Sequence, residues 1–160
     1  MKTGIDFSYE GSFRKHPFLK CRVRTAVLRT LRYEKIKVPC TVSVLFTDND
    51  GIKEINREFR NVDRETDVLS FPENEFSPGS FDKDTCEFDH SSGRYILGDI
   101  VISVPKCEQQ GKEFGHSVYK EVEYLTVHSM LHLLGYDHVD EGEMKRQMRS
   151  REKIIMGEKE

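Results

Sequence analysis

Residues 128–138 read HSMLHLLGYDH and impose the strictest local requirement on the folding of this chain. His128 and His132 stand four residues apart in an apolar run, so a helix would place both imidazoles on one face, one turn apart. Gly135 tolerates the left-handed conformation that ends a helix, which lets His138 turn back toward the first two. The segment therefore predicts a helix end that directs three histidines at one point.

Three histidines at this spacing indicate a metal site. Three neutral imidazoles around one zinc leave a fourth position for water, which is the arrangement of catalytic zinc sites and not of closed structural ones. A lone histidine near an apolar helix is usually a hydrogen-bonded residue without a metal, but this spacing favours a shared ion. We predict one Zn²⁺ per chain, held by His128, His132 and His138. The remaining histidines have no partner spacing and are predicted to be incidental (His16, His90 and His116).

The residue after the first histidine distinguishes this motif from that of zinc proteases. Those enzymes carry H-E-x-x-H, in which the glutamate is the general base for the attacking water. Here the position is Ser129, and a serine hydroxyl does not accept a proton at neutral pH as a carboxylate does. The predicted metal geometry is kept, while peptide hydrolysis loses its usual base.

Length and composition predict one globular domain. A chain of 160 residues with 36% hydrophobic content can bury one core. The sequence shows no apolar run of membrane-spanning length and no signal-peptide core at its start, so we expect a cytosolic protein. The four cysteines include no C-x-x-C pair, which argues against a cysteine zinc site or a redox dithiol and favours reduced structural thiols.

Charge is segregated along the chain. Residues 13–38 hold nine Lys or Arg against one acid, and residues 73–89 hold six acids against one lysine. A basic stretch can contact nucleic acid, and a solvated helix face explains it equally well. The candidate substrate-binding cations on this stretch are Lys20, Arg24 and Arg29.

The periodicity of apolar residues predicts an α+β domain, with a small mixed sheet of about four strands covered by helices and the zinc site at the end of a central helix. The expected strands are 38–47, 67–71 and 95–103, with 5–9 as a fourth candidate. Expected helices are the basic amphipathic stretch within 13–38, residues 48–61 capped by Asp48, a short helix from Pro105 to Gly115, the histidine helix capped by Ser117, and a C-terminal helix within 140–160. In the first two, the apolar residues at helical spacing are expected to anchor the helix to the core: Leu19, Val23, Ala26, Val27, Thr30 and Leu31 in one, and Ile52, Ile55 and Phe59 in the other. Residues 73–94 lack periodicity and are predicted to form a mobile loop.

The histidine motif resembles that of the YbeY endoribonucleases, with variation only at its second and third positions. Two further segments are similar to blocks of that family, namely REFRNVDRETDVLSFP (57–72) and LGDIVIS (97–103). The three cover residues 42–138 in the family's order. Glu65 is a departure, because the family typically has proline there, before a threonine, and this affects a turn and not a ligand.

The resemblance implies a metal-dependent endoribonuclease, specific for single strands, that acts in ribosomal RNA maturation, including the 3′ end of the small-subunit RNA, and in ribosome quality control. It implies zinc on the three histidines and Arg60 as the basic residue of the substrate cleft, with single-stranded rRNA precursors and the small ribosomal subunit as partners. Arg60 and His128 are the candidate catalytic residues. A guanidinium suits the charge that grows on phosphate oxygens, although an arginine taken at random is more often an exposed or ion-paired residue.

Two alternatives stay open at this level: a zinc hydrolase of the peptidase type with another base, and a noncatalytic RNA-binding factor in which zinc supports the fold. Several polar residues beside the motifs also stay unassigned (Asp67, Ser70, Asp99 and Asp137). Asp137 can orient a ligand imidazole or cap the helix end. The oligomeric state is not predicted.

Overall fold

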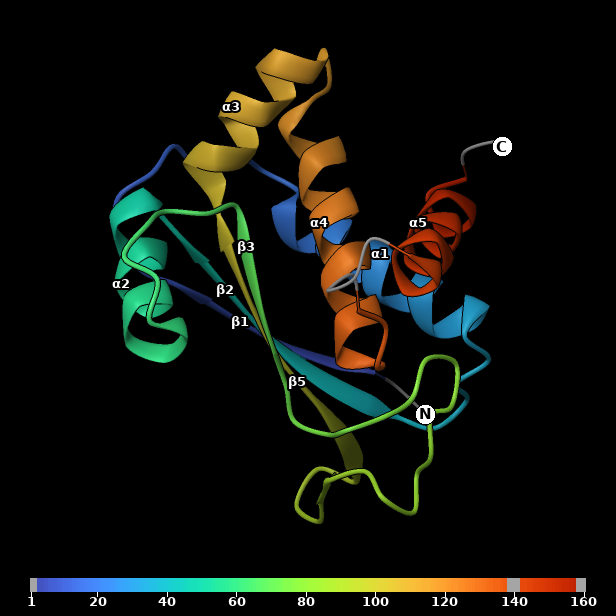
Figure 1. The fold of residues 1–160 in the computed structure, drawn as a ribbon. Coiled ribbons are helices and arrows are strands. Elements are labelled where there is room, and N and C mark those ends of the chain that lie inside the picture. Colours follow the sequence, from blue (N-terminus) through green and yellow to red (C-terminus); the bar gives the residue numbers. More distant parts are fainter. Residues whose placement is uncertain (1–2, 138–141, 158–160) are drawn as a thin grey trace.

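The chain forms an α+β domain in which helices and strands alternate irregularly, as the periodicity of its apolar residues predicted (Figure 1). The computed structural model describes residues 3–137 and 142–157. Within them the elements are β1 (Gly4–Tyr9), α1 (Leu19–Tyr33), β2 (Cys40–Thr47), α2 (Asn49–Arg60), β3 (Val68–Pro72), β4 (Phe88–Asp89), β5 (Arg94–Ser103), α3 (Val104–Phe114), α4 (Val118–Leu133) and α5 (Glu143–Ile155).

The sheet is mixed, and its strand order is β1-β2-β5-β3, with β4 also paired to β5. β1 and β5 flank β2 in parallel, while β3 and β4 run antiparallel to β5. The described residues therefore form five strands, one more than the four expected. The additional strand, β4, is two residues long and lies within 73–94. A strand this short is not predictable from the alternation of apolar and polar residues. The mobility of that segment stays a prediction.

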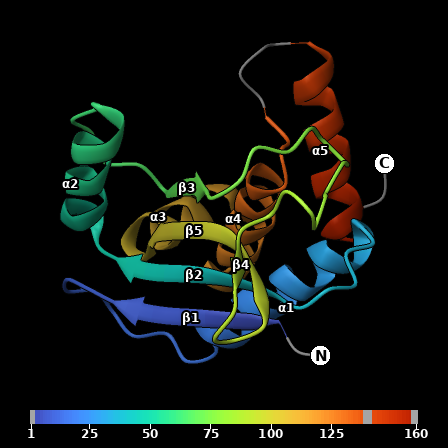
Figure 2. The ribbon, with the colours of Figure 1, turned by 90° about the horizontal axis from the view of Figure 1, so that it is seen from below.

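The helices α1 and α4 pack against each other beside the sheet (Figure 2). The residues that α1 buries are those whose helical spacing predicted its inner face: Leu19, Val23, Ala26, Val27, Thr30 and Leu31. Each large apolar side chain buried in this way stabilises the fold by roughly 1.5–3 kcal/mol. Among the described helices, none is both long and apolar enough to cross a membrane.

Side-chain caps fix where several helices begin. Asp48 accepts a hydrogen bond from the backbone N–H of Gly51 at 2.8 Å, and Ser117 accepts one from Lys120 at 3.1 Å, as predicted. Asp48 also accepts from the N–H of Ser12 at 2.8 Å. These backbone donors lower the pKa of Asp48, because they stabilise the ionised carboxylate.

The expectation that Phe59 anchors α2 in the core is wrong. Ile52 is fully buried, whereas Phe59 is 64% exposed and meets Phe71 edge-to-face with ring centroids 5.7 Å apart. Phe59 stays exposed because its neighbour Phe71 belongs to β3, which is the edge strand of the sheet. Nothing in the described chain continues the sheet beyond that edge to cover the last turn of α2.

Candidate active site

The two helical histidines of the motif meet at the end of α4. The Nε2 atoms of His128 and His132 lie 3.2 Å apart, with their rings nearly perpendicular. Two ligand atoms of a tetrahedral zinc, with bonds of about 2.0–2.1 Å, are separated by about 3.3 Å. The pair is therefore spaced to share one metal ion.

Glu152 of α5 fixes the orientation of His128. Its Oε1 lies 2.6 Å from Nδ1 of His128, and its Oε2 accepts a hydrogen bond from the Tyr124 hydroxyl at 2.9 Å. An ionised carboxylate can only accept, so the imidazole hydrogen lies on Nδ1 and the Nε2 lone pair remains for a metal. Burial, followed by the charge of Glu152, raises the pKa of Tyr124, so the phenol stays protonated and donates. Sequence reasoning missed Glu152, because its 24-residue separation from His128 gives no spacing signal.

The chain turns at Gly135 as the motif predicted. Its φ is +99°, and a side chain there would clash with the backbone carbonyl of Phe76. Glycine is thus required both by the backbone conformation and by the close approach of the 73–94 segment. The third predicted ligand, His138, lies outside the described residues. The fit of the site to a metal accordingly rests on His128, His132 and the Glu152 contact.

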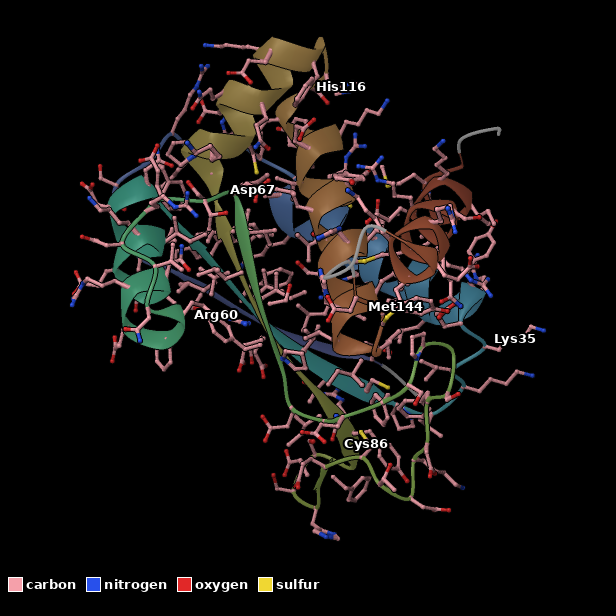
Figure 3. The ribbon with its side chains drawn as sticks, in the orientation of Figure 1. Lys35, Arg60, Asp67, Cys86, His116 and Met144 are labelled. Carbon is pink, nitrogen blue, oxygen red and sulfur yellow. The ribbon has the colours of Figure 1, made fainter. Side chains whose placement is uncertain are left out.

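A groove of about 770 Å³ contains both histidines and Arg60. Arg60 is the last residue of α2, and its side chain extends toward β3 (Figure 3). Its Nη2 donates to the carbonyl oxygen of Ser70, and the guanidinium lies over the Phe71 ring, 5.0 Å from the centroid. The structure therefore brings together the arginine and the histidine pair, which lie about 70 residues apart in the sequence.

The connection after α2 shapes one wall of the groove. Asn61 ends the helix with a left-handed φ of +59°, a conformation that asparagine tolerates better than most residues. The buried Asn56 donates from Nδ2 to the carbonyl of Arg64 at 3.0 Å and holds the following loop. Arg64 is a second cation among the groove residues. No residue spacing in the sequence singled it out.

The unassigned polar residues separate into two groups. Asp67, Ser70 and Asp137 line the groove. Asp99 is exposed on β5, opposite Phe71 of β3, and is not a groove residue. Ser129 is fully buried and also outside the groove, and no described residue hydrogen-bonds its Oγ, so it does not replace the glutamate base of the zinc proteases.

The cations of α1 lie away from this groove, since no residue of α1 is among those that line it. The ammonium of Lys20 lies 5.4 Å from the centroid of the Tyr9 ring, and Arg24 is exposed. Arg29 donates to the Ile155 carbonyl at 3.5 Å. Their predicted role in substrate binding stays a prediction.

Comparison with known proteins identifies the family. The family model for endoribonuclease YbeY matches residues 11–160. The chain belongs to the YbeY endoribonuclease family. It is similar to "Endoribonuclease YbeY" of Clostridium kluyveri, with 49% identity over 140 residues that cover 84% of this chain and 85% of that protein. The protein of the same name in Clostridium acetobutylicum is 48% identical over 145 residues, which cover 86% of each chain.

A solved structure supports the fold. The solution structure of a Thermotoga maritima protein is similar with a TM-score of 0.56 and 25% identity, and the match covers 98% of this chain and 90% of the other. Membership in the YbeY family makes this chain a hydrolase of RNA phosphodiester bonds with a part in rRNA maturation. The prediction of an endoribonuclease is confirmed, and the peptidase and noncatalytic alternatives are set aside.

Proposed function

We propose that this YbeY member is a zinc-dependent endoribonuclease that cuts single-stranded RNA, with one Zn²⁺ held by His128, His132 and His138. The family is metal-dependent, and the identity of the metal is the proposed part. The observation that carries the proposal is the 3.2 Å approach of the two Nε2 atoms in a groove that also holds Arg60. Two imidazoles and a cation in one groove suit the hydrolysis of an anionic diester.

The protein's own side chains have distinct roles in this proposal. Bound zinc would lower the pKa of water toward about 7 and supply a nucleophile at neutral pH. Glu152 keeps the hydrogen of His128 on Nδ1, so that Nε2 is always presented as a ligand. Tyr124 donates to the other oxygen of Glu152 and holds the carboxylate in place.

Arg60 would stabilise the phosphate as negative charge grows on its nonbridging oxygens. One Nη2 hydrogen is occupied by the Ser70 carbonyl, which fixes the direction of the guanidinium. The remaining N–H groups can donate in pairs to a phosphate. The Phe71 ring beneath the guanidinium adds a cation–π contact that restricts its motion.

The proposed substrates are single-stranded rRNA precursors, including the 3′ end of the small-subunit RNA, with the small ribosomal subunit and its factors as partners. We further propose a cytoplasmic location and a part in ribosome quality control. The α1 cations Lys20, Arg24 and Arg29 would contact the RNA backbone at a distance from the groove, in a salt-dependent manner.

The test combines metal analysis with cleavage. Purified protein should contain about one zinc per chain, and His128→Ala, His132→Ala and His138→Ala should each lower zinc content sharply. Single-stranded RNA should be cut faster than a duplex of the same sequence, and a chelator should abolish cleavage. Equal zinc in the wild type and in all three variants would refute the metal assignment.

A further inference from the structure

A second cavity, of about 310 Å³, adjoins the groove between α3 and α4. We call it the Glu121 cavity; its lining includes Asp67, Gln110, Phe114, His116, Glu121 and Tyr124. Asp67 also lines the groove, so the two hollows share a wall. Figure 3 shows Asp67 just before β3 and His116 at the turn between α3 and α4. The volume is at the lower end of the range for pockets that hold small ligands.

Glu121 is a largely buried residue whose side chain lines the cavity. Its residue is 7% exposed, and among the residues that the structure describes none forms a hydrogen bond or ion pair with its side chain. Burial raises the pKa of Glu121; the neighbouring His116 opposes this shift, the charge of Asp67 adds to it, and Lys120 opposes it. The first turn of α4 favours a negative charge, and the carboxylate oxygens face the cavity, where water or a ligand with hydrogen-bond donors can reach them.

Asp67, the other acid of the cavity, accepts hydrogen bonds from the protein itself and holds Gln110 in place. Asp67 Oδ1 accepts from the N–H of Val68 at 2.7 Å, and Oδ2 accepts from Nε2 of Gln110 at 3.2 Å. The amide nitrogen of Gln110 is thereby held by Asp67, which leaves its Oε1 as a second acceptor. In the described chain Asp67 and Glu121 are not part of a cluster suited to a metal ion. The cavity therefore offers hydrogen-bond acceptors to a ligand that donates.

Aromatic rings and cations complete the lining. Phe114 is 64% exposed and Tyr124 is 38% exposed, so both offer ring surface to a planar group. His116 and Lys120 are exposed at the cavity and can donate to an acceptor on the ligand. His116 was predicted to be incidental, and the structure places it in the lining of this cavity.

The position of the cavity relates it to the scissile phosphate. Glu121 and His128 lie seven residues apart on α4, which is two turns and roughly 10 Å along the helix axis. Both side chains consequently face the same side of α4, one in the cavity and one in the groove. A nucleotide next to the phosphate at the histidines is within reach of the cavity.

We propose that the Glu121 cavity binds the base of a nucleotide beside the scissile phosphate and prefers guanine. This inference rests on the proposed single-strand cleavage in the groove. Unpaired bases of single-stranded RNA are recognised by aromatic stacking and by hydrogen bonds to their Watson–Crick edges.

Guanine suits the acceptors better than the other bases do. Its Watson–Crick edge presents N1–H and the N2 amino group side by side, and a carboxylate accepts such a pair through two parallel hydrogen bonds. Its O6 is an acceptor for His116 or Lys120. Uracil has one donor on that edge, between two acceptors that Glu121 would repel. Glu121 thus becomes a specificity residue for the YbeY reaction.

The first experiment measures base preference in cleavage. Single-turnover rates are compared for RNAs that differ only in the nucleotide beside the cut, which is guanosine, inosine, adenosine or uridine. Wild type should cut the guanosine RNA at least about tenfold faster than the uridine RNA. Inosine lacks the N2 amino group and should fall between them. Glu121→Gln should lose most of this preference while it still cuts the uridine RNA.

A control variant and a second variant separate recognition from folding. Glu113→Gln changes an exposed carboxylate on α3 and should keep the wild-type preference. Gln110→Ala removes the second acceptor and should also weaken the preference for guanosine. This variant tests the inference even if Glu121→Gln fails to fold.

The second experiment measures binding without cleavage. Guanosine 5′-monophosphate should perturb the NMR signals of Glu121 and Gln110 at lower concentration than inosine 5′-monophosphate does, and Glu121→Gln should remove the difference. Equal binding of the two nucleotides, or a wild-type cleavage preference that Glu121→Gln leaves intact, overturns the inference. Failure of wild type to cut any RNA would instead refute the proposed function, and the nucleotide titration would still decide on the cavity.

Discussion

Glu152→Gln tests how the protein prepares His128 for a metal. The carboxylate accepts from His128 Nδ1 at 2.6 Å and from the Tyr124 hydroxyl at 2.9 Å, and the Glu152 residue is 5% exposed. Glutamine has the same shape, with one accepting oxygen and one donating NH₂ group. If its oxygen faces His128, the NH₂ group can donate to the Tyr124 oxygen, so both contacts survive and only the charge is lost.

The expected loss of zinc affinity follows from removing this charge. Loss of a carboxylate that orients a ligand histidine typically lowers metal affinity by about 10- to 100-fold, which is about 1.4–2.7 kcal/mol. The opposite amide orientation would place the NH₂ group at Nδ1 and move the imidazole hydrogen to Nε2, which removes the lone pair needed by a metal. Both orientations lower zinc affinity, while the metal-free stability changes little because neither polar contact is left unmade.

The assay is a competitive zinc titration against a chromophoric chelator, together with thermal unfolding of the metal-free protein. Glu143→Gln is the matched control, because Glu143 lies on the same helix and its side chain is 86% exposed. We expect the control to bind zinc like the wild type. Unchanged zinc affinity in Glu152→Gln would contradict this role of the carboxylate, because it would mean that the neutral amide holds His128 equally well.

Three further predictions address other parts of the molecule. Arg60→Ala should keep zinc content and thermal stability near those of the wild type but lower single-turnover RNA cleavage by on the order of 100-fold or more, with partial rescue by Arg60→Lys; a wild-type rate at saturating RNA would make the arginine structural. Neutral substitutions at Lys20, Arg24 and Arg29 should weaken RNA binding and flatten its dependence on salt, and an unchanged salt slope would mark α1 as a solvated face. Asp48→Ala should destabilise the fold by about 1 kcal/mol or more. Because the folded pKa of Asp48 is lowered, its stabilisation should be present above its usual pKa and be lost as the pH falls through the folded pKa; an equal wild-type advantage at pH 7 and at pH 2 in denaturant titrations would contradict this.

The elements of the fold follow from local patterns wherever one side of an element is buried. The apolar spacing in α1 predicted its buried face, and Asp48 and Ser117 predicted two helix starts. Local patterns did not predict elements or burial that depend on a residue far away in the sequence. The two-residue β4 forms only because β5 offers a pairing edge, and Phe59 is exposed because α2 ends beside an edge strand.

For the active site, two local features of the sequence specify the available metal ligands: the helical spacing of His128 and His132, and the glycine that turns the chain after them. These features depend on helix geometry and on a single backbone conformation, both of which are local. The groups that act on the histidines are set by tertiary contacts and have no local signal. Glu152, Arg60 and the Glu121 cavity come from separate elements, and they meet because burying the apolar faces of α4 and the sheet fixes the distances between residues far apart in the chain.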